Sequence, residues 1–126
     1  MTTKNPQPAG APQPVGPYTP IVRAGDWLIC SGQVGLRGGS LVDGGVAAQV
    51  AQAIANLESL LVREGSDLRA VVKTTVFLAD IDEFAAMNDA YIAAFGNHRP
   101  ARSAFAVAAL PLDARVEIEA WAYLGA

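Results

Sequence analysis

Arg102 stands where an uncharged residue would be expected, and it is the first candidate for chemistry. It follows Pro100-Ala101 and opens a stretch without a single charge, residues 103–112. An unpaired arginine is costly to bury, so we expect Arg102 to meet an opposite charge. That charge belongs either to Asp80 or Asp113 at the edge of a sheet, or to the carboxylate of a ligand. The residues alone leave both alternatives open.

Glu117 and Glu119 are the second candidates. Apolar and other residues alternate strictly over residues 115–123, which is typical of a strand with one buried face. Both carboxylates then share a face with Trp121 and Tyr123. A positioned carboxylate can act as a general base, but a solvated strand face produces the same pattern. The alternation does not choose between the two glutamates.

The sequence offers few candidates for metal ligands or for a catalytic nucleophile. His98 is its only histidine and Cys30 its only cysteine, so no Cys/His metal cluster can form, and we expect no metal site. We expect His98 to be a solvated loop residue rather than a base, and Cys30 a buried strand residue. No G-x-S-x-G elbow is present. The glycines at 35–39 fit turns better than a phosphate-binding loop.

Length and composition predict one domain that associates with copies of itself. The chain has 126 residues, of which 52% are hydrophobic and 17% charged. So much apolar surface on so small a chain suggests cover by other subunits. The net charge of −3 and the scattered basic residues argue against nucleic acid as a partner. We find no leader and no membrane span, and a single cysteine fits a reducing compartment, so the cytoplasm is expected.

The elements that must position these side chains follow from the hydrophobic pattern. Residues 1–15 are rich in proline and predict a flexible arm, with a single domain over 16–126. Each predicted helix stands between strands, as in a right-handed βαβ crossover. We therefore predict an α+β fold of order β-β-α-β-α-β-β, one mixed sheet with two helices packed on one face. The predicted strands are 18–23, 27–34, 70–79, 103–112 and 115–123, and the predicted helices are 46–64 and 82–96.

The strand predicted over 103–112 lacks any polar alternation. Such strands are typically covered on both faces. Helices can cover one face, and a second subunit is the simplest cover for the other.

Six blocks of the sequence resemble, in order and spacing, those of the Rid/YjgF family. The resemblance implies a chorismate-mutase-like fold and a homotrimer whose three sheets form a central barrel with sites in the clefts between subunits. It also implies hydrolysis of reactive 2-imino or 2-enamino acids to 2-oxo acids and ammonia, with no cofactor. The blocks are Gly16-Pro17-Tyr18, Ser31-Gly32-Gln33, residues 72–78, Asn88 with Tyr91, Pro100-Ala101-Arg102-Ser103 and residues 116–120.

The resemblance also implies roles for single residues. Arg102 matches the arginine that grips the substrate carboxylate, and its planar fork suits bidentate binding. Glu117 matches an acidic residue that orients or activates the attacking water. Ala104 stands where the best-studied subgroup often has a cysteine, which leaves the subgroup and the physiological substrate undecided. The residues that match pocket-lining positions are Tyr18, Ser31, Gly32 and Asn88.

Two other functions compete with deamination. A non-catalytic trimer that binds small carboxylates, or a chaperone-like holdase, would need Arg102 but not Glu117, so the presence of both favours catalysis. The endoribonuclease activity sometimes ascribed to this family fits poorly with a pI near 4.9.

Overall fold

The computed structural model describes residues 16–125. The proline-rich arm predicted over residues 1–15 lies outside them and stays a prediction.

One mixed five-stranded sheet forms the centre of the fold, in the order β1-β2-β7-β5-β6. Neighbouring strands run antiparallel except β5 and β6, which are parallel. A separate two-stranded hairpin, β3 (Leu36–Arg37) with β4 (Ser40–Leu41), turns at two glycines with positive φ. The strands of the main sheet are β1 (Ile21–Ala24), β2 (Trp27–Val34), β5 (Val71–Leu78), β6 (Ala101–Ala106) and β7 (Val116–Tyr123).

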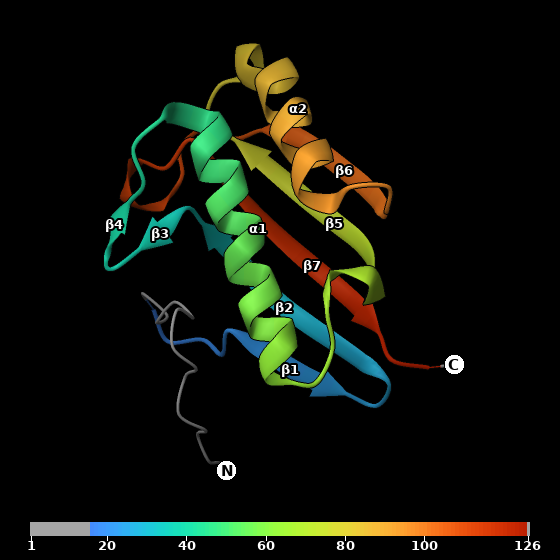
Figure 1. Ribbon diagram of the computed structural model, residues 1–126. Helices are drawn as coiled ribbons and strands as arrows, with labels where there is room; N and C mark the ends of the chain where they lie inside the picture. The colour runs from blue at the N-terminus through green and yellow to red at the C-terminus, as the bar shows by residue number, and fades with distance from the viewer. Residues whose placement is uncertain (1–15, 126) are drawn as a thin grey trace.

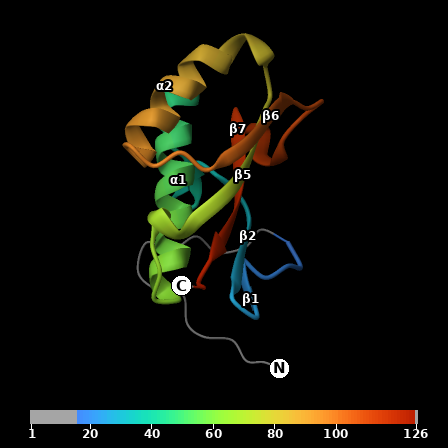
Figure 2. The same ribbon diagram turned by 90° about the vertical axis from the view of Figure 1, so that its right-hand side faces the viewer.

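Two helices cover one face of this sheet (Figure 1). Helix α1 (Gly45–Arg63) packs over β2 and β7 and against α2 (Phe84–Phe95), which connects β5 to β6. Figure 2 shows both helices on the same side, with the other side of the sheet open. The predicted α+β order and layers are confirmed. A trimeric barrel is beyond what a single chain shows.

Alternating side chains place the core between the sheet and α1. In β7, Val116, Ile118, Ala120 and Ala122 are fully buried on the helix side.

By length and composition α1 could cross a membrane, contrary to our expectation that no segment approaches a span. Half of that stretch is buried inside the fold, so its apolar residues are accounted for as the inner face of a core helix.

The strand predicted over 103–112 is shorter than expected. β6 ends at Ala106, because its partner β5 ends at Leu78. Beyond it, Leu112 and Asp113 adopt left-handed backbone conformations that end any extended path. β6 is also an edge strand, and the chain itself covers only its helix side: Phe105 on the other side is 46% exposed. Cover of the other face by a second subunit stays a prediction.

The helix-free side of the sheet, called the open face below, carries large apolar side chains. Trp27 contacts Trp121 and Tyr123 with ring centroids 6.0 and 5.0 Å apart. All three rings are more than one-third exposed. An exposed apolar patch on a sheet is typical of a surface that binds another protein chain.

Candidate active site

A cavity of about 250 Å³ opens on the open face where β2 and β7 run side by side. Four of the residues matched by resemblance meet there, from the approach to β1, from β2 and from β7. The lining residues are Tyr18, Ser31, Gly32, Val34, Pro111 and Glu117.

A β-bulge in β2 shapes the floor of this cavity. Cys30 pairs with Ala120 and Gln33 with Ile118, so that Ser31 and Gly32 together oppose one residue of β7. The Ser31 hydroxyl donates to the Thr19 carbonyl at 2.7 Å. This bond holds the chain that carries Tyr18 against the cavity.

Gly32 makes room for the Glu117 carboxylate. A Cβ atom at position 32 would overlap a Glu117 carboxylate oxygen and lie 2.8 Å from its Cδ. The absence of a side chain therefore lets the carboxylate sit directly over the backbone of β2.

The Glu117 carboxylate has no cationic partner among residues 16–125. Burial raises the pKa of Glu117 above its ordinary value, and the neighbouring Glu119 carboxylate adds to the rise. A base with a raised pKa accepts a proton more readily near neutral pH. Glu117 therefore has the electrostatic properties of a general base.

Arg102 lies in a different place, beneath α2. Its guanidinium carbon is 4.9 Å from the centroid of the Tyr91 ring and 5.6 Å from that of Phe84. One N–H group reaches the Met87 sulfur at 3.8 Å. Contacts of this kind hold a guanidinium without neutralising it. Arg102 forms no ion pair with any described residue, so its charge is available to a ligand.

Asn88 shares this side of α2. It stands four residues after Phe84 and three before Tyr91, and residues at these spacings are neighbours on one helix face. Its Oδ1 atom is buried and accepts no hydrogen bond from the described chain. Ala104, two residues after Arg102 on β6, packs partly against the core on the same side.

The strand register separates the two charged candidates onto opposite faces of the sheet. Arg102 pairs with Thr74, which pairs with Ala120 on the helix side of β7. Glu117 is an odd number of residues from Ala120 and therefore faces the other way. One chain thus presents its unpaired base and its unpaired arginine on different faces.

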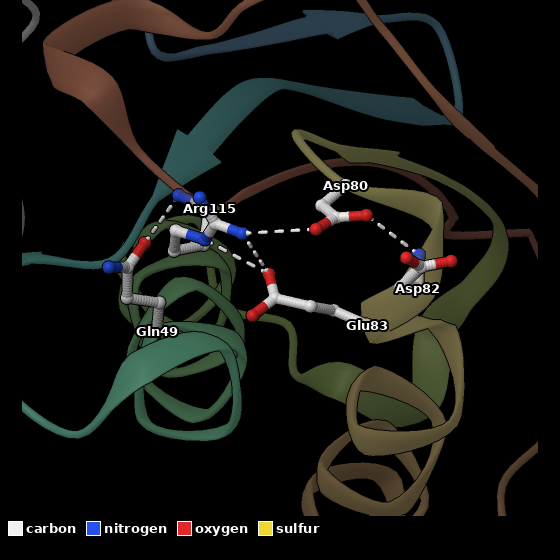
Figure 3. A network of polar contacts seen from close by, with 5 residues as sticks. All are labelled: Gln49, Asp80, Asp82, Glu83 and Arg115. Atoms are coloured by element: carbon white, nitrogen blue, oxygen red, sulfur yellow. Dashed lines mark hydrogen bonds and ion pairs between the residues drawn. The ribbon is translucent and has the colours of Figure 1, made fainter.

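Asp80, which the sequence offered as a partner for Arg102, pairs with Arg115 instead (Figure 3). The Arg115 guanidinium donates two hydrogen bonds to Glu83, at 2.9 and 2.7 Å, and its backbone N–H donates to Gln49. This network joins the start of β7 to α1 and to the turn before α2. It fixes the strand that carries Glu117, two residues further on.

The remaining candidates have structural positions. His98 lies in a loop, as expected, but it is half-buried rather than solvated, and its Nε2 lies 2.7 Å from the Val71 carbonyl. The close backbone carbonyl requires that Nε2 donate. Cys30 is 2% exposed, as expected of a strand residue. Within residues 16–125 no group of His, Cys, Asp and Glu side chains could hold a metal ion.

Sequence reasoning missed several neighbours of the two charges. Val34 could not have been found, because alternation from Cys30 places it on the helix side and only the bulge brings it opposite Glu117. Pro111 could not, because its place depends on a turn that returns to β7. The Tyr91 block was recognised, but nothing local shows that its ring lies against Arg102.

Comparison with known proteins identifies the relatives of this architecture. The family model described as Endoribonuclease L-PSP matches residues 8–124. A mouse protein named 2-iminobutanoate/2-iminopropanoate deaminase is 47% identical over 117 residues, which cover 91% of this chain and 87% of the mouse protein. A mitochondrial protein of Schizosaccharomyces pombe, mmf1, is 38% identical over 94% of this chain and 75% of its own.

Solved structures agree with these sequence matches. A putative endoribonuclease L-PSP from Entamoeba histolytica superposes with a TM-score of 0.87 at 44% identity, covering 91% of this chain and 94% of the other. E. coli TdcF with bound serine gives a TM-score of 0.86 at 33% identity, with coverages of 91% and 94%. With the match of the family model over nearly the whole domain, these similarities show that the chain belongs to the Rid/YjgF/L-PSP family.

Proposed function

We propose that this protein hydrolyses reactive 2-imino and 2-enamino acids to 2-oxo acids and ammonia, as a deaminase of the 2-iminobutanoate/2-iminopropanoate type. One observation in the structure carries the proposal: the Glu117 carboxylate, with a raised pKa and no cationic partner within residues 16–125, lies in a cavity of about 250 Å³. The deaminases named among its relatives cover more than 90% of the chain.

The proposed hydrolysis requires mainly that the water and the substrate be positioned. An iminium carbon is already electrophilic, so a water held by Glu117 adds to C2 while its proton passes to the carboxylate. The resulting carbinolamine takes that proton back from Glu117 on nitrogen, the C–N bond breaks, and ammonia leaves as the C2 carbonyl forms and the hydroxyl proton passes to the carboxylate and then to solvent. An enamine first takes a proton on carbon to become the iminium ion. Glu117 supplies the base and later returns the proton.

Arg102 anchors the substrate carboxylate in this proposal. A substrate cannot reach Arg102 and Glu117 of the same chain from one side, because they face opposite sides of the sheet. The site is therefore completed by another copy of the chain. We propose a homotrimer in which the cavity of one subunit meets the Arg102 side of the next. The apolar open face, with its exposed tryptophans, supports such packing.

The remaining matched residues shape the site in two groups. Tyr18, Ser31 and Gly32 surround the Glu117 carboxylate. Asn88 and Ala104 belong to the Arg102 side, where the buried Asn88 Oδ1 has no hydrogen-bond partner among the described residues.

The cellular compartment is a separate part of the proposal. One relative is named as mitochondrial. We propose a cytoplasmic protein, on the grounds of its unpaired cysteine. Fractionation of cells that express the full chain from its own gene tests this.

The decisive test generates imino acids in situ from several amino acids and follows ammonia, with semicarbazide trapping the free imine. We expect the protein to accelerate ammonia release and to reduce semicarbazone formation. A sedimentation experiment should find three chains per particle at micromolar concentration. Absence of any acceleration with every imino acid tried would reject the enzyme, and a monomer would reject the shared site.

Ribonuclease activity is the competing reading offered by the family's description. Within residues 16–125, the only charged group that lines the cavity is the Glu117 carboxylate, and the chain's net charge is −3. Both features repel a phosphate backbone. Cleavage of RNA that persists in Glu117→Gln and weakens with added salt would favour that reading.

A further inference from the structure

The guanidinium of Arg102 is held by contacts that carry no negative charge. It lies over the Tyr91 ring, beside Phe84 and Met87. Contacts of this kind leave a long side chain free to swing unless the ring itself is fixed. What fixes the ring therefore decides where the guanidinium points.

The far end of the Tyr91 ring is held by a buried hydrogen bond. The Tyr91 hydroxyl and the Thr74 Oγ1 are 2.7 Å apart. Thr74 is 1% exposed and Tyr91 4% exposed, so no solvent competes for this bond. Thr74 is also the residue of β5 that pairs with Arg102 of β6. Strand β5, helix α2 and strand β6 are thus joined at one level through three side chains.

We infer that Thr74 and Tyr91 are positioning residues for Arg102: their hydrogen bond sets the plane of the ring on which the guanidinium lies, and so the direction of its N–H groups toward the substrate carboxylate. This inference rests on the proposed function. Thr74 and Tyr91 touch no reacting atom.

The charge state of Tyr91 fits this role. Burial raises the pKa of Tyr91 above its ordinary value, so the hydroxyl keeps its proton at neutral pH. A neutral ring attracts the guanidinium by its face and leaves the full positive charge for the ligand. A phenolate there would have paired with Arg102 instead.

A purely structural role for the hydrogen bond between Tyr91 and Thr74 predicts a different result. Tyr91→Phe and Thr74→Val each remove one hydroxyl at nearly constant shape, and the double variant leaves no buried polar group unpaired. If the bond only stabilises the fold, its loss affects every variant of Arg102 equally. If the bond positions the arginine, its loss changes KM and Kd only in proteins that keep the planar guanidinium at position 102.

The experiment is therefore a double-mutant cycle with Tyr91→Phe in the wild-type and Arg102→Lys backgrounds. kcat and KM are measured with 2-iminobutanoate generated in situ, and the Kd of the product 2-oxobutanoate by calorimetry. We expect Tyr91→Phe to raise KM and Kd about three- to tenfold in the wild type, with kcat less affected. In Arg102→Lys, whose compact ammonium has no plane to orient, Tyr91→Phe should add nothing.

Two further results complete the test. Thr74→Val should match Tyr91→Phe, and the double variant should be no worse than the poorer single variant. Ser66→Ala removes a hydroxyl just after α1, outside the residues placed in the site and on the open face, and it should keep wild-type constants.

An equal fold-change for Tyr91→Phe in both backgrounds, or an unchanged KM and Kd in the wild type, would overturn the inference. A wild-type protein that releases no ammonia would instead overturn the proposed function. The calorimetric Kd would then still report how Arg102 binds a carboxylate.

Discussion

The surroundings of Glu117 and of Arg102 differ in almost every respect. Glu117 lies on the open face, in a cavity floored by backbone, where Gly32 contributes space rather than contacts. Arg102 lies on the helix side, against aromatic rings and a sulfur. The carboxylate is destabilised by its position, as its raised pKa shows, whereas the guanidinium is supported by favourable contacts.

This difference explains how one small chain keeps two opposite charges apart. Within reach of each other, a glutamate and an arginine would form an ion pair, and neither would be available to a substrate. Strand β5 and the two faces of the sheet prevent that pairing inside a chain. In the trimer that we propose, the charges meet only across a contact between chains, with substrate between them.

Replacing Glu117 by glutamine should have the largest effect on catalysis. The change keeps the shape and removes the base, and a general base typically contributes about 10²–10⁴-fold, so we expect a loss of that order in kcat. Glu119→Gln is the matched control on the same strand face and should be mild. Equal losses in the two variants would show that water is not held by Glu117.

Replacing Arg102 by lysine tests the other side of the comparison. The ammonium keeps the charge but loses the bidentate fork, which should lower kcat/KM by about 10–100-fold, chiefly through KM. Arg99→Lys, in the exposed loop just before β6, is the control and should stay near wild type. A normal KM in Arg102→Lys would contradict the assignment of the carboxylate anchor.

Replacing Gly32 by alanine should have a smaller effect of about tenfold in kcat. The added methyl group meets the Glu117 carboxylate and pushes it from its place, and displacing a catalytic group is costly. In a Glu117→Gln background the same change should cost little, because the base is already gone. A full additional loss there would mean that Gly32 contributes to the site independently of Glu117.

The smallest expected effect is on stability, and its sign is opposite to the effect on activity. Because the folded protein binds the Glu117 proton more tightly than the unfolded chain does, this group favours folding below its ordinary pKa. That contribution is lost as the pH rises through the raised pKa. We therefore expect Glu117→Gln to have a higher Tm than wild type near pH 7, with the difference shrinking toward pH 4.

Thermal unfolding at several pH values, followed by circular dichroism at one protein concentration, checks this. Activity should show the complementary trend, falling in the wild type as Glu117 takes up its proton. A Glu117→Gln variant less stable than wild type at neutral pH would show that the carboxylate has a favourable partner in the assembled protein.

Local sequence patterns predicted the helices and strands well, but they predicted less well which residues of different elements lie together. The three- and four-residue spacing along α1 and the glycine after it predicted that helix, and the alternation in β7 placed Glu117 on the correct strand face. Both depend only on neighbours in the chain. The resemblance to the family selected Glu117 over Glu119 and gathered the four residues that the cavity brings together.

The separation of Arg102 from Glu117 could not be predicted in this way. It depends on strand order and register across β7, β5 and β6, which join segments distant in sequence. The bulge at Ser31-Gly32 changes the register by one residue without any local mark. The length of β6 depends on where β5 ends, and composition alone suggested a longer strand.

Cys30 provides a way to measure how often the neighbouring strands separate. It is the only cysteine of the chain, 2% exposed, between Ile21 of β1 and Ala120 of β7. Burial raises its pKa to about 12, so at neutral pH on the order of one thiol in 10⁵ is ionised. A thiol reagent can therefore modify it only during the moments when these strands part. The labelling rate thus reports how often the strands beside the Glu117 cavity part, and it does so in the wild-type sequence, with no cysteine introduced and no substrate turned over.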